Sequence, residues 1–157
     1  MDIAIMIEGQ NGLNWPRWKQ IVRLVEDLGF AGLYRSDHFT NADPADIDSL
    51  ELWVSLTWLA GNTERIEFGP LVTPFSFRHP AHTARMAGAV DDLSGGRLTL
   101  GLGAGWQDRE HEKFGFPLLD RLLRHPLLAK IHACHIIRGV DDEKQDEGND
   151  INADQDR

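Results

Sequence analysis

Segments typical of buried strands begin at intervals of about thirty residues, and this spacing constrains the fold more than any other feature of the chain. The apolar runs start near Ile3, Ala31, Arg65 and Arg97, and a helical pattern of apolar residues follows the first three. In a strand–helix–strand unit of this length the helix crosses over, so that neighbouring strands run parallel. We therefore predict an α/β fold in which helices cover parallel strands.

Capping and turn residues mark where the predicted helices begin and end. Asn14 can cap a helix that carries Pro16 in its first turn, and Gly29 ends that helix. Asp48, with Glu51 three residues later, resembles a capping box at the start of the next helix. The alternation of strands and helices is thus supported by local signals as well as by spacing.

Two architectures are built from such units: an open doubly wound sheet and a closed (β/α)₈ barrel. The barrel needs eight units and about 250 residues. This chain has 157 residues and shows four units. In both architectures ligands bind at the carboxyl ends of the strands, so the residues that follow each strand are the candidate site.

The repeating pattern stops after Pro117. Residues 118–138 are helix-like and basic, and we predict a helical segment that is separate from the repeating units. Residues 139–157 contain eight acidic and two basic residues, which together contribute −6 to the total formal charge of −9. Because residues 139–157 contain almost no large apolar side chains, we predict an acidic disordered tail.

Composition narrows the class of protein. A net charge of −9 argues against a nucleic-acid partner, which requires a basic face. No apolar run reaches the length of about eighteen residues that a membrane-spanning helix needs. The single cysteine, Cys134, suits a reducing compartment, so we expect a cytoplasmic protein.

The stretch "RSDHF" (Arg35–Phe39) follows the second predicted strand and contains the sharpest candidate pair, Asp37 and His38. Histidine exchanges a proton near neutral pH, and a neighbouring carboxylate can raise its pKa or fix its orientation. Because neighbours in an extended chain point to opposite sides, we expect only one of the two to face a ligand. The alternative is that Asp37 binds loop N–H groups and His38 packs at the rim of the sheet.

Other motifs are less specific. "GLGAG" (Gly101–Gly105) could bring backbone N–H groups close to a cofactor, or could form a bulge or a close helix contact. It is not a dinucleotide fingerprint, because Trp106 stands where the last glycine is required. His79 and His82 lack supporting carboxylates or cysteines, so we expect no metal site. Residues 110–112, "EHE", look like an exposed, charged helix start.

Residues 1–117 resemble the luciferase-like monooxygenase superfamily, particularly its deazaflavin-dependent oxidoreductase branch. The resemblance rests on "EDLGFAGLYRSDHF", "FGPLVTPFSFRHPA" and "DDLSGGRLTLGLGAGWQDREHEKFGFP", which occur in the family's order. It implies a TIM-type (β/α)₈ barrel with FMN or coenzyme F-420 across the strand ends. The four units would then be the first half of a barrel, a half-barrel, in a truncated chain.

The resemblance also implies roles for particular residues. His38, with Asp37 beside it, would lie near the reactive ring and the substrate. Leu71 and Val72 would form a bulge behind the ring, where family members often have a non-prolyl cis peptide. The cofactor channel would be lined by Gly103, Ala104 and Gly105. Several deazaflavin enzymes of the family have a glutamate where this sequence has Trp106.

Two hypotheses follow. In the first, the protein is a flavin- or deazaflavin-dependent oxidoreductase or monooxygenase that acts on a small organic substrate, with His38 as acid, base or ring partner. In the second, it is a non-catalytic half-barrel that self-associates through open sheet edges and binds no cofactor well. Both lead us to expect a homo-oligomer. Arg35 and Arg78 are the side chains expected to meet an anionic cofactor.

Overall fold

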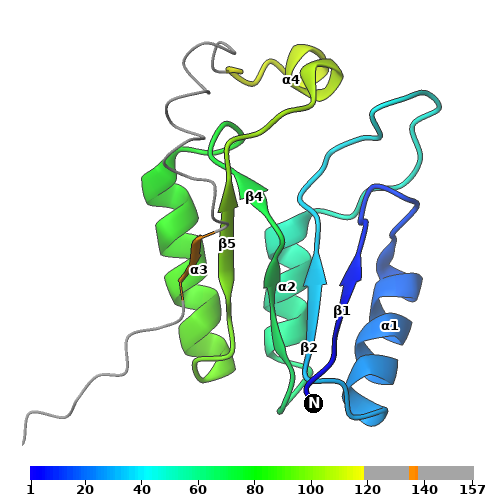
Figure 1. The fold of residues 1–157 in the computed structure, drawn as a ribbon, viewed down its shortest axis with the longest axis vertical. Helices are drawn as coiled ribbons and strands as arrows, with labels where there is room; N and C mark the ends of the chain where they lie inside the picture. Colours follow the sequence, from blue (N-terminus) through cyan, green and yellow to red (C-terminus); the bar gives the residue numbers. More distant parts are fainter. Residues whose placement is uncertain (119–134, 138–157) are drawn as a thin grey trace, which may run out of the picture.

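The structure, a computed structural model, describes residues 1–118 and 135–137. Within these residues, four strand–helix units follow one another, which confirms the predicted α/β fold (Figure 1). The elements, in chain order, are β1 (Ala4–Ile7), α1 (Trp15–Asp27), β2 (Gly32–Arg35), α2 (Leu52–Ala60), β3 (Glu67–Pro70), β4 (Thr73–Pro74), α3 (Pro80–Ser94), β5 (Leu100–Gly103), α4 (Asp108–Phe114) and β6 (His135–Ile137).

The strands form two sheets that meet at Phe68. One sheet has the parallel order β1-β2-β3, and in the other β4 runs parallel to β5 while β6 runs antiparallel to it. A parallel bridge between Phe68 and Leu98 links the two, and Thr99 N donates to Phe68 O at 2.8 Å. In Figure 1 the arrowheads of β1 to β5 point toward the end where α4 and the β2–α2 loop lie. This end collects the residues that follow each strand.

The third predicted strand is divided into β3 and β4. Leu71 and Val72 lie between the two short strands, and the peptide bond that joins them is cis. The resemblance to the luciferase-like family implied a non-prolyl cis peptide at this position, and the structure confirms it. Both residues follow the carboxyl end of β3, and Leu71 N still donates a hydrogen bond to Arg35 O of β2 at 2.8 Å.

The second helix begins later than the capping pattern predicted. Its N-cap is Glu51, whose carboxylate accepts a hydrogen bond from Val54 N at 2.7 Å. Asp48 instead accepts a hydrogen bond from the Asn14 side chain at 3.2 Å, so it connects the two loops that precede α1 and α2. The predicted capping box is wrong because the partner of Asp48 is distant in sequence.

Part of the segment predicted as helical is a strand. β6 pairs with β5, with Leu100 opposite Ile137 and Leu102 opposite His135. The outer edge of β5 offers backbone N–H and C=O groups, and a strand can satisfy them where a helix cannot. The other residues of the predicted helical segment from 119 onward, and the predicted acidic tail 139–157, lie outside the described residues.

The apolar core lies between the strands and helices α1 to α3. Trp18 is fully buried, and its indole N–H donates to Ser55 O at 3.0 Å. The buried apolar side chains include Val22, Val25, Leu33, Leu52, Trp53, Leu56, Leu59, Ile66, Phe68, Ala87, Val90 and Leu98. Burial of so many large apolar groups fixes the sheet against its helices and holds the strand ends in place.

Arg35 belongs to this interior, contrary to the expectation that it would meet a cofactor. It is 1% exposed, and its guanidinium donates to Ser55 Oγ at 2.7 Å and to Leu50 O at 2.6 Å. It also lies over the Trp18 ring, 5.6 Å from the ring centroid. Burial lowers the pKa of Arg35 to about 10, although the negative charges of Asp37 and Glu51 oppose this. Arg35 thus joins the end of β2 to α2.

The contact between β3 and the chain before β5 leads to a prediction about stability. A Cβ atom at Gly69 would lie 1.8 Å from the carbonyl oxygen of Thr99, which is backbone and cannot move aside without breaking the bridge. We expect Gly69→Ala to lower the free energy of unfolding by about 2 kcal/mol or more, as overpacking does. Urea denaturation measures the change.

Gly88→Ala is the matched control. Gly88 is exposed in the middle of α3, and a Cβ atom there would meet nothing within 4 Å. Alanine in a helix interior should raise stability by about 0.5–1 kcal/mol relative to glycine. Equal effects of the two substitutions would contradict the close approach of β3 to the segment before β5.

Candidate active site

A cleft of about 460 Å³ opens at the carboxyl ends of the strands. Its volume lies in the range of small-molecule sites. Of the seven site residues that the sequence predicted, six line this cleft and Asp37 does not. The lining residues are Met6, Glu8, Gln10, Ser36, His38, Leu71, Val72, Pro74, Gly103, Ala104, Gly105 and Trp106.

One wall of the cleft is formed by backbone and small side chains. A Cβ atom at Gly103 would lie 2.5 Å from Val72 Cγ2, so this position needs glycine for β5 to approach the Leu71–Val72 bulge. Gly105 has φ +80°, and a Cβ atom there would lie 2.6 Å from Ser76 Oγ. The glycines of "GLGAG" therefore make a close, smooth wall beside the cleft, rather than a dinucleotide loop.

Apolar side chains stand exposed around this wall. Trp106 is 63% exposed, and its ring meets the His38 ring edge-on, with 5.7 Å between centroids and 79° between planes. Met6 and Leu71 are also exposed apolar residues of the lining. Exposed large apolar groups that converge on one cleft are typical of a ligand-binding surface.

The opposite side of the cleft is polar. Ser36 Oγ accepts a hydrogen bond from Gly9 N at 2.9 Å and donates to Gln10 Oε1 at 2.6 Å, so the end of β2 holds the loop after β1. The Gln10 amide in turn donates to Glu8 Oε2 at 2.6 Å. None of the lining residues is lysine or arginine, so the described cleft carries no permanent positive charge.

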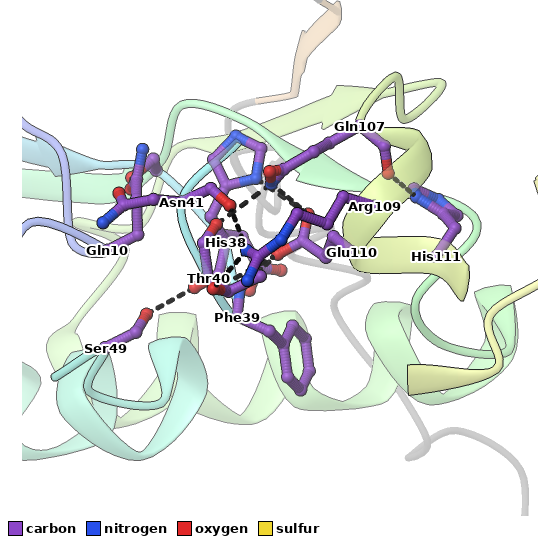
Figure 2. Close-up of polar contacts among 12 residues, drawn as sticks. Gln10, His38, Phe39, Thr40, Asn41, Ser49, Gln107, Arg109, Glu110 and His111 are labelled. Carbon is purple, nitrogen blue, oxygen red and sulfur yellow. Dashed lines mark hydrogen bonds and ion pairs between the residues drawn. The ribbon is translucent and has the colours of Figure 1, made fainter. Parts of the chain in front are cut away.

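His38 is held by a buried carboxylate on α4. Its Nδ1 lies 2.9 Å from Glu110 Oε2, and Glu110 is 0% exposed (Figure 2). Glu110 Oε1 accepts hydrogen bonds from the backbone N–H groups of Phe39 and, at 3.2 Å, Thr40. The Gln107 amide donates to Glu110 Oε2 at 3.2 Å and to Thr40 O at 3.0 Å. Within the described residues, the structure gives His38 Nε2 no hydrogen-bond partner.

The environment of His38 changes its pKa. Burial alone would lower that pKa, but the hydrogen bond to Glu110 and the negative charges of Glu110, Glu8 and Asp37 outweigh burial. The pKa of His38 is therefore raised above the ordinary value of 6.5. The side chain can carry or release a proton near neutral pH.

Asp37 faces away from the cleft. Its carboxylate accepts hydrogen bonds from Thr73 Oγ1 at 2.6 Å and from both terminal nitrogens of Arg78, at 2.5 Å and 3.3 Å. Arg78 also pairs with Glu51 at 2.9 Å. Burial would lower the pKa of Arg78, but these two carboxylates raise it. Arg78 is thus already neutralised, contrary to the expectation that it would meet an anionic cofactor.

The sequence interpretation of "EHE" as an exposed helix start is wrong for two of its three residues. Glu110 and His111 are both buried, and the His111 ring bonds to Gln107 O at 2.7 Å and to Ser76 Oγ at 2.8 Å. Gln107, Glu110, His111 and Phe114 recur at intervals of three and four residues, which is the spacing of one helix face. This spacing can be seen in the sequence, but three of the four residues are polar, so the pattern does not look like a buried apolar face.

Exposed ion pairs fasten α4 to the β2–α2 loop. Arg109 donates to Asp46 Oδ1 at 2.8 Å and to Asn41 O at 2.7 Å, and Lys113 pairs with the other oxygen of Asp46. These contacts lower the pKa of Asp46. Together with Glu110, they place α4 over the loop that carries His38.

Two further classes of site are absent from residues 1–118 and 135–137. No group of three or more histidine, cysteine, aspartate or glutamate side chains is arranged to hold a metal ion in this part of the chain. No helix in the same part combines the length and apolar character needed to cross a bilayer.

Residues 1–126 match the family model described as luciferase-like monooxygenase. Among curated relatives, the chain is 34% identical over 123 residues to 5,10-methylenetetrahydromethanopterin reductase of Archaeoglobus fulgidus, which covers 78% of this chain and 33% of the relative. It is 33% identical over 130 residues to pyrimidine monooxygenase RutA of Pseudomonas syringae, which covers 73% and 36%.

Solved structures agree. The coenzyme F420-dependent tetrahydromethanopterin reductase from Methanopyrus kandleri superposes with a TM-score of 0.57 at 28% identity, over 74% of this chain and 30% of that one. The chain therefore spans about a third of the length of the relatives it matches. These relatives are named reductases and monooxygenases, which favours the enzymatic hypothesis over the non-catalytic half-barrel. The chain belongs to the luciferase-like monooxygenase family.

Proposed function

We propose that this chain supplies the ring-binding and proton-handling part of an oxidoreductase or monooxygenase that uses coenzyme F-420 or FMN on a small organic substrate. The observation that carries the proposal is that six of the predicted site residues line one cleft at the strand ends, where none of the described residues bonds to His38 Nε2. Because the chain matches about a third of its relatives, the activity of the whole protein is part of the proposal.

The residues of the cleft fit a flat, largely apolar ring. Gly103 and Gly105 bring backbone close to the open space, and Leu71 and Trp106 offer apolar surface that such a ring would cover. The lining has no lysine or arginine, and Arg35 and Arg78 are engaged elsewhere. The fit therefore concerns the ring system. An anionic tail would have to be held by residues other than those lining this cleft.

His38 is the residue that we propose to act in the chemistry. A bound flavin or deazaflavin supplies hydride transfer or oxygen activation. The protein supplies orientation and a proton at His38 Nε2, since Nδ1 is bound to Glu110 and only Nε2 remains for a ligand. A raised pKa keeps a substantial protonated fraction near neutral pH, which suits a general acid as well as a base. Asp37 acts on His38 only through its charge.

Filling the cleft should weaken cofactor binding. Ala104 is partly exposed in its lining, and Ala104→Leu would fill space that a ring needs. We expect the variant to weaken binding of FMN or coenzyme F-420 by about tenfold or more, equivalent to about 1.4 kcal/mol. Fluorescence titration of this chain with each cofactor measures it. Ala89→Leu, on the exposed face of α3, is the matched control and should bind as the parent does. If both variants bind alike, the cleft is not the ring site.

His38 can be tested in a full-length protein that contains this segment. His38→Gln keeps a polar side chain but cannot exchange a proton, so turnover should fall about a hundredfold or more while the melting temperature changes little. Steady-state rates with the reduced cofactor measure the loss. His82→Gln, on the exposed first turn of α3, should leave turnover unchanged. Retained turnover in His38→Gln would refute the assignment.

We also expect the chain to self-associate. β1 lies at the edge of its sheet, and Met6 on that strand is an exposed apolar residue. Unpaired strand edges with apolar side chains favour association with another copy. We expect sedimentation velocity to show a dimer or larger species, and Met6→Lys to shift the population toward monomer. A monomer at all concentrations would contradict this expectation.

A further inference from the structure

Glu110 has no assigned role in the proposed reaction, yet its carboxylate lies 2.9 Å from Nδ1 of the reacting residue, His38. We propose that Glu110 is a positioning residue: its buried carboxylate holds the His38 ring in one tautomer and one orientation, with Nδ1–H toward Glu110 and the Nε2 lone pair toward the cleft. Only the chemical role of Nε2 toward a ligand rests on the proposed function. The state of the ring itself can be tested without any cofactor.

The first argument is the set of groups around the Glu110 carboxylate. Two backbone N–H groups, those of Phe39 and Thr40, face Oε1, and the Gln107 amide faces Oε2. All three are donors, so they suit an ionised carboxylate, which accepts hydrogen bonds and has none to give. A protonated acid would add a fourth donor, which among the surrounding groups only a His38 ring without a proton on Nδ1 could accept. The arrangement of donors around Glu110 leaves an acceptor for His38 at Oε2.

The ionised carboxylate determines which nitrogen of the His38 ring carries the proton. Nδ1 lies 2.9 Å from Glu110 Oε2, and a carboxylate oxygen that only accepts requires the proton to be on Nδ1. The neutral ring then has its lone pair on Nε2. His38 lines the cleft, and Nε2 is the ring nitrogen that the contact with Glu110 leaves available to a ligand there. In this form His38 can take up a proton from the cleft and later return it.

The third argument is mechanical. Glu110 is fully buried and binds the backbone of the two residues that follow His38 as well as the ring. Figure 2 shows Glu110 extending from α4 toward the segment His38–Thr40. Backbone and ring are thus held by one carboxylate, which leaves the ring little freedom to turn. The Trp106 ring closes the other side, edge-on to His38.

The charges that act on His38 come from three segments. Glu110 lies on α4, Glu8 lies in the loop after β1, and Asp37 precedes His38 in the chain. All three are negative and raise its pKa, while Asp37 is itself paired with Arg78. Glu110 is the one of the three that is hydrogen-bonded to the ring. Removing its charge should therefore lower the pKa of His38.

A purely structural role is the competing explanation. Glu110 would then serve only to satisfy the N–H groups of Phe39 and Thr40. Glu110→Gln distinguishes the positioning role from the purely structural role. The glutamine carbonyl can still accept a backbone hydrogen bond, whereas the negative charge is lost. Glu112→Gln is the matched control, since Glu112 is exposed on the same helix two residues further on.

The experiment is nitrogen-15 NMR of the histidine rings in this chain, titrated over pH without cofactor. We expect neutral His38 in the parent to be the Nδ1–H tautomer, its pKa to fall in Glu110→Gln, and no change in Glu112→Gln. The Nε2–H tautomer in the parent, or an unchanged pKa in Glu110→Gln, would overturn the proposal. Should Glu110→Gln not fold, the tautomer in the parent still decides. Loss of cofactor binding would refute the proposed function but leave this result intact.

Discussion

The carboxylate of Glu110 joins segments that are 72 residues apart in the sequence, and the geometry of the cleft depends on that contact. It brings α4 over the β2–α2 loop, binds the backbone at Phe39 and Thr40, and holds the His38 ring. A buried carboxylate is costly unless every oxygen is satisfied, and here four donors satisfy it. The same contact that stabilises the loop therefore occupies Nδ1 of His38, and Nε2 has no partner in the part of the chain that the structure describes.

Successive side chains at the end of β2 point alternately into the interior and into the cleft. Arg35 and Asp37 point away from the cleft, toward α2 and Arg78, while Ser36 and His38 line it. A chain with period two assigns successive side chains to opposite faces. The stretch "RSDHF" thus contributes Arg35 and Asp37 to contacts in the interior, and Ser36 and His38 to the lining of the cleft.

The sequence predicted the strand–helix units, the cis bond between Leu71 and Val72, and the glycine wall at Gly103, because each depends on local patterns or on stretches shared with the family. It did not predict that Arg35 and Arg78 are engaged in hydrogen bonds and ion pairs with other residues of the chain, nor that Glu110 is buried. Those facts depend on contacts between segments far apart in the chain. A charged residue on a short helix is usually exposed, and only the packing of α4 against the loop reverses that expectation.

The claim that the strand ends form a cofactor-ring site is tested most directly by mapping where the ring contacts this chain. Backbone and histidine resonances would be followed while FMN or coenzyme F-420 is added to nitrogen-15-labelled protein. The account predicts that the largest shifts occur at Gly103, Gly105, Val72 and the His38 ring, and that exposed residues of α3 such as Arg85 do not respond. Shifts concentrated on α3, with none at the cleft, would contradict it.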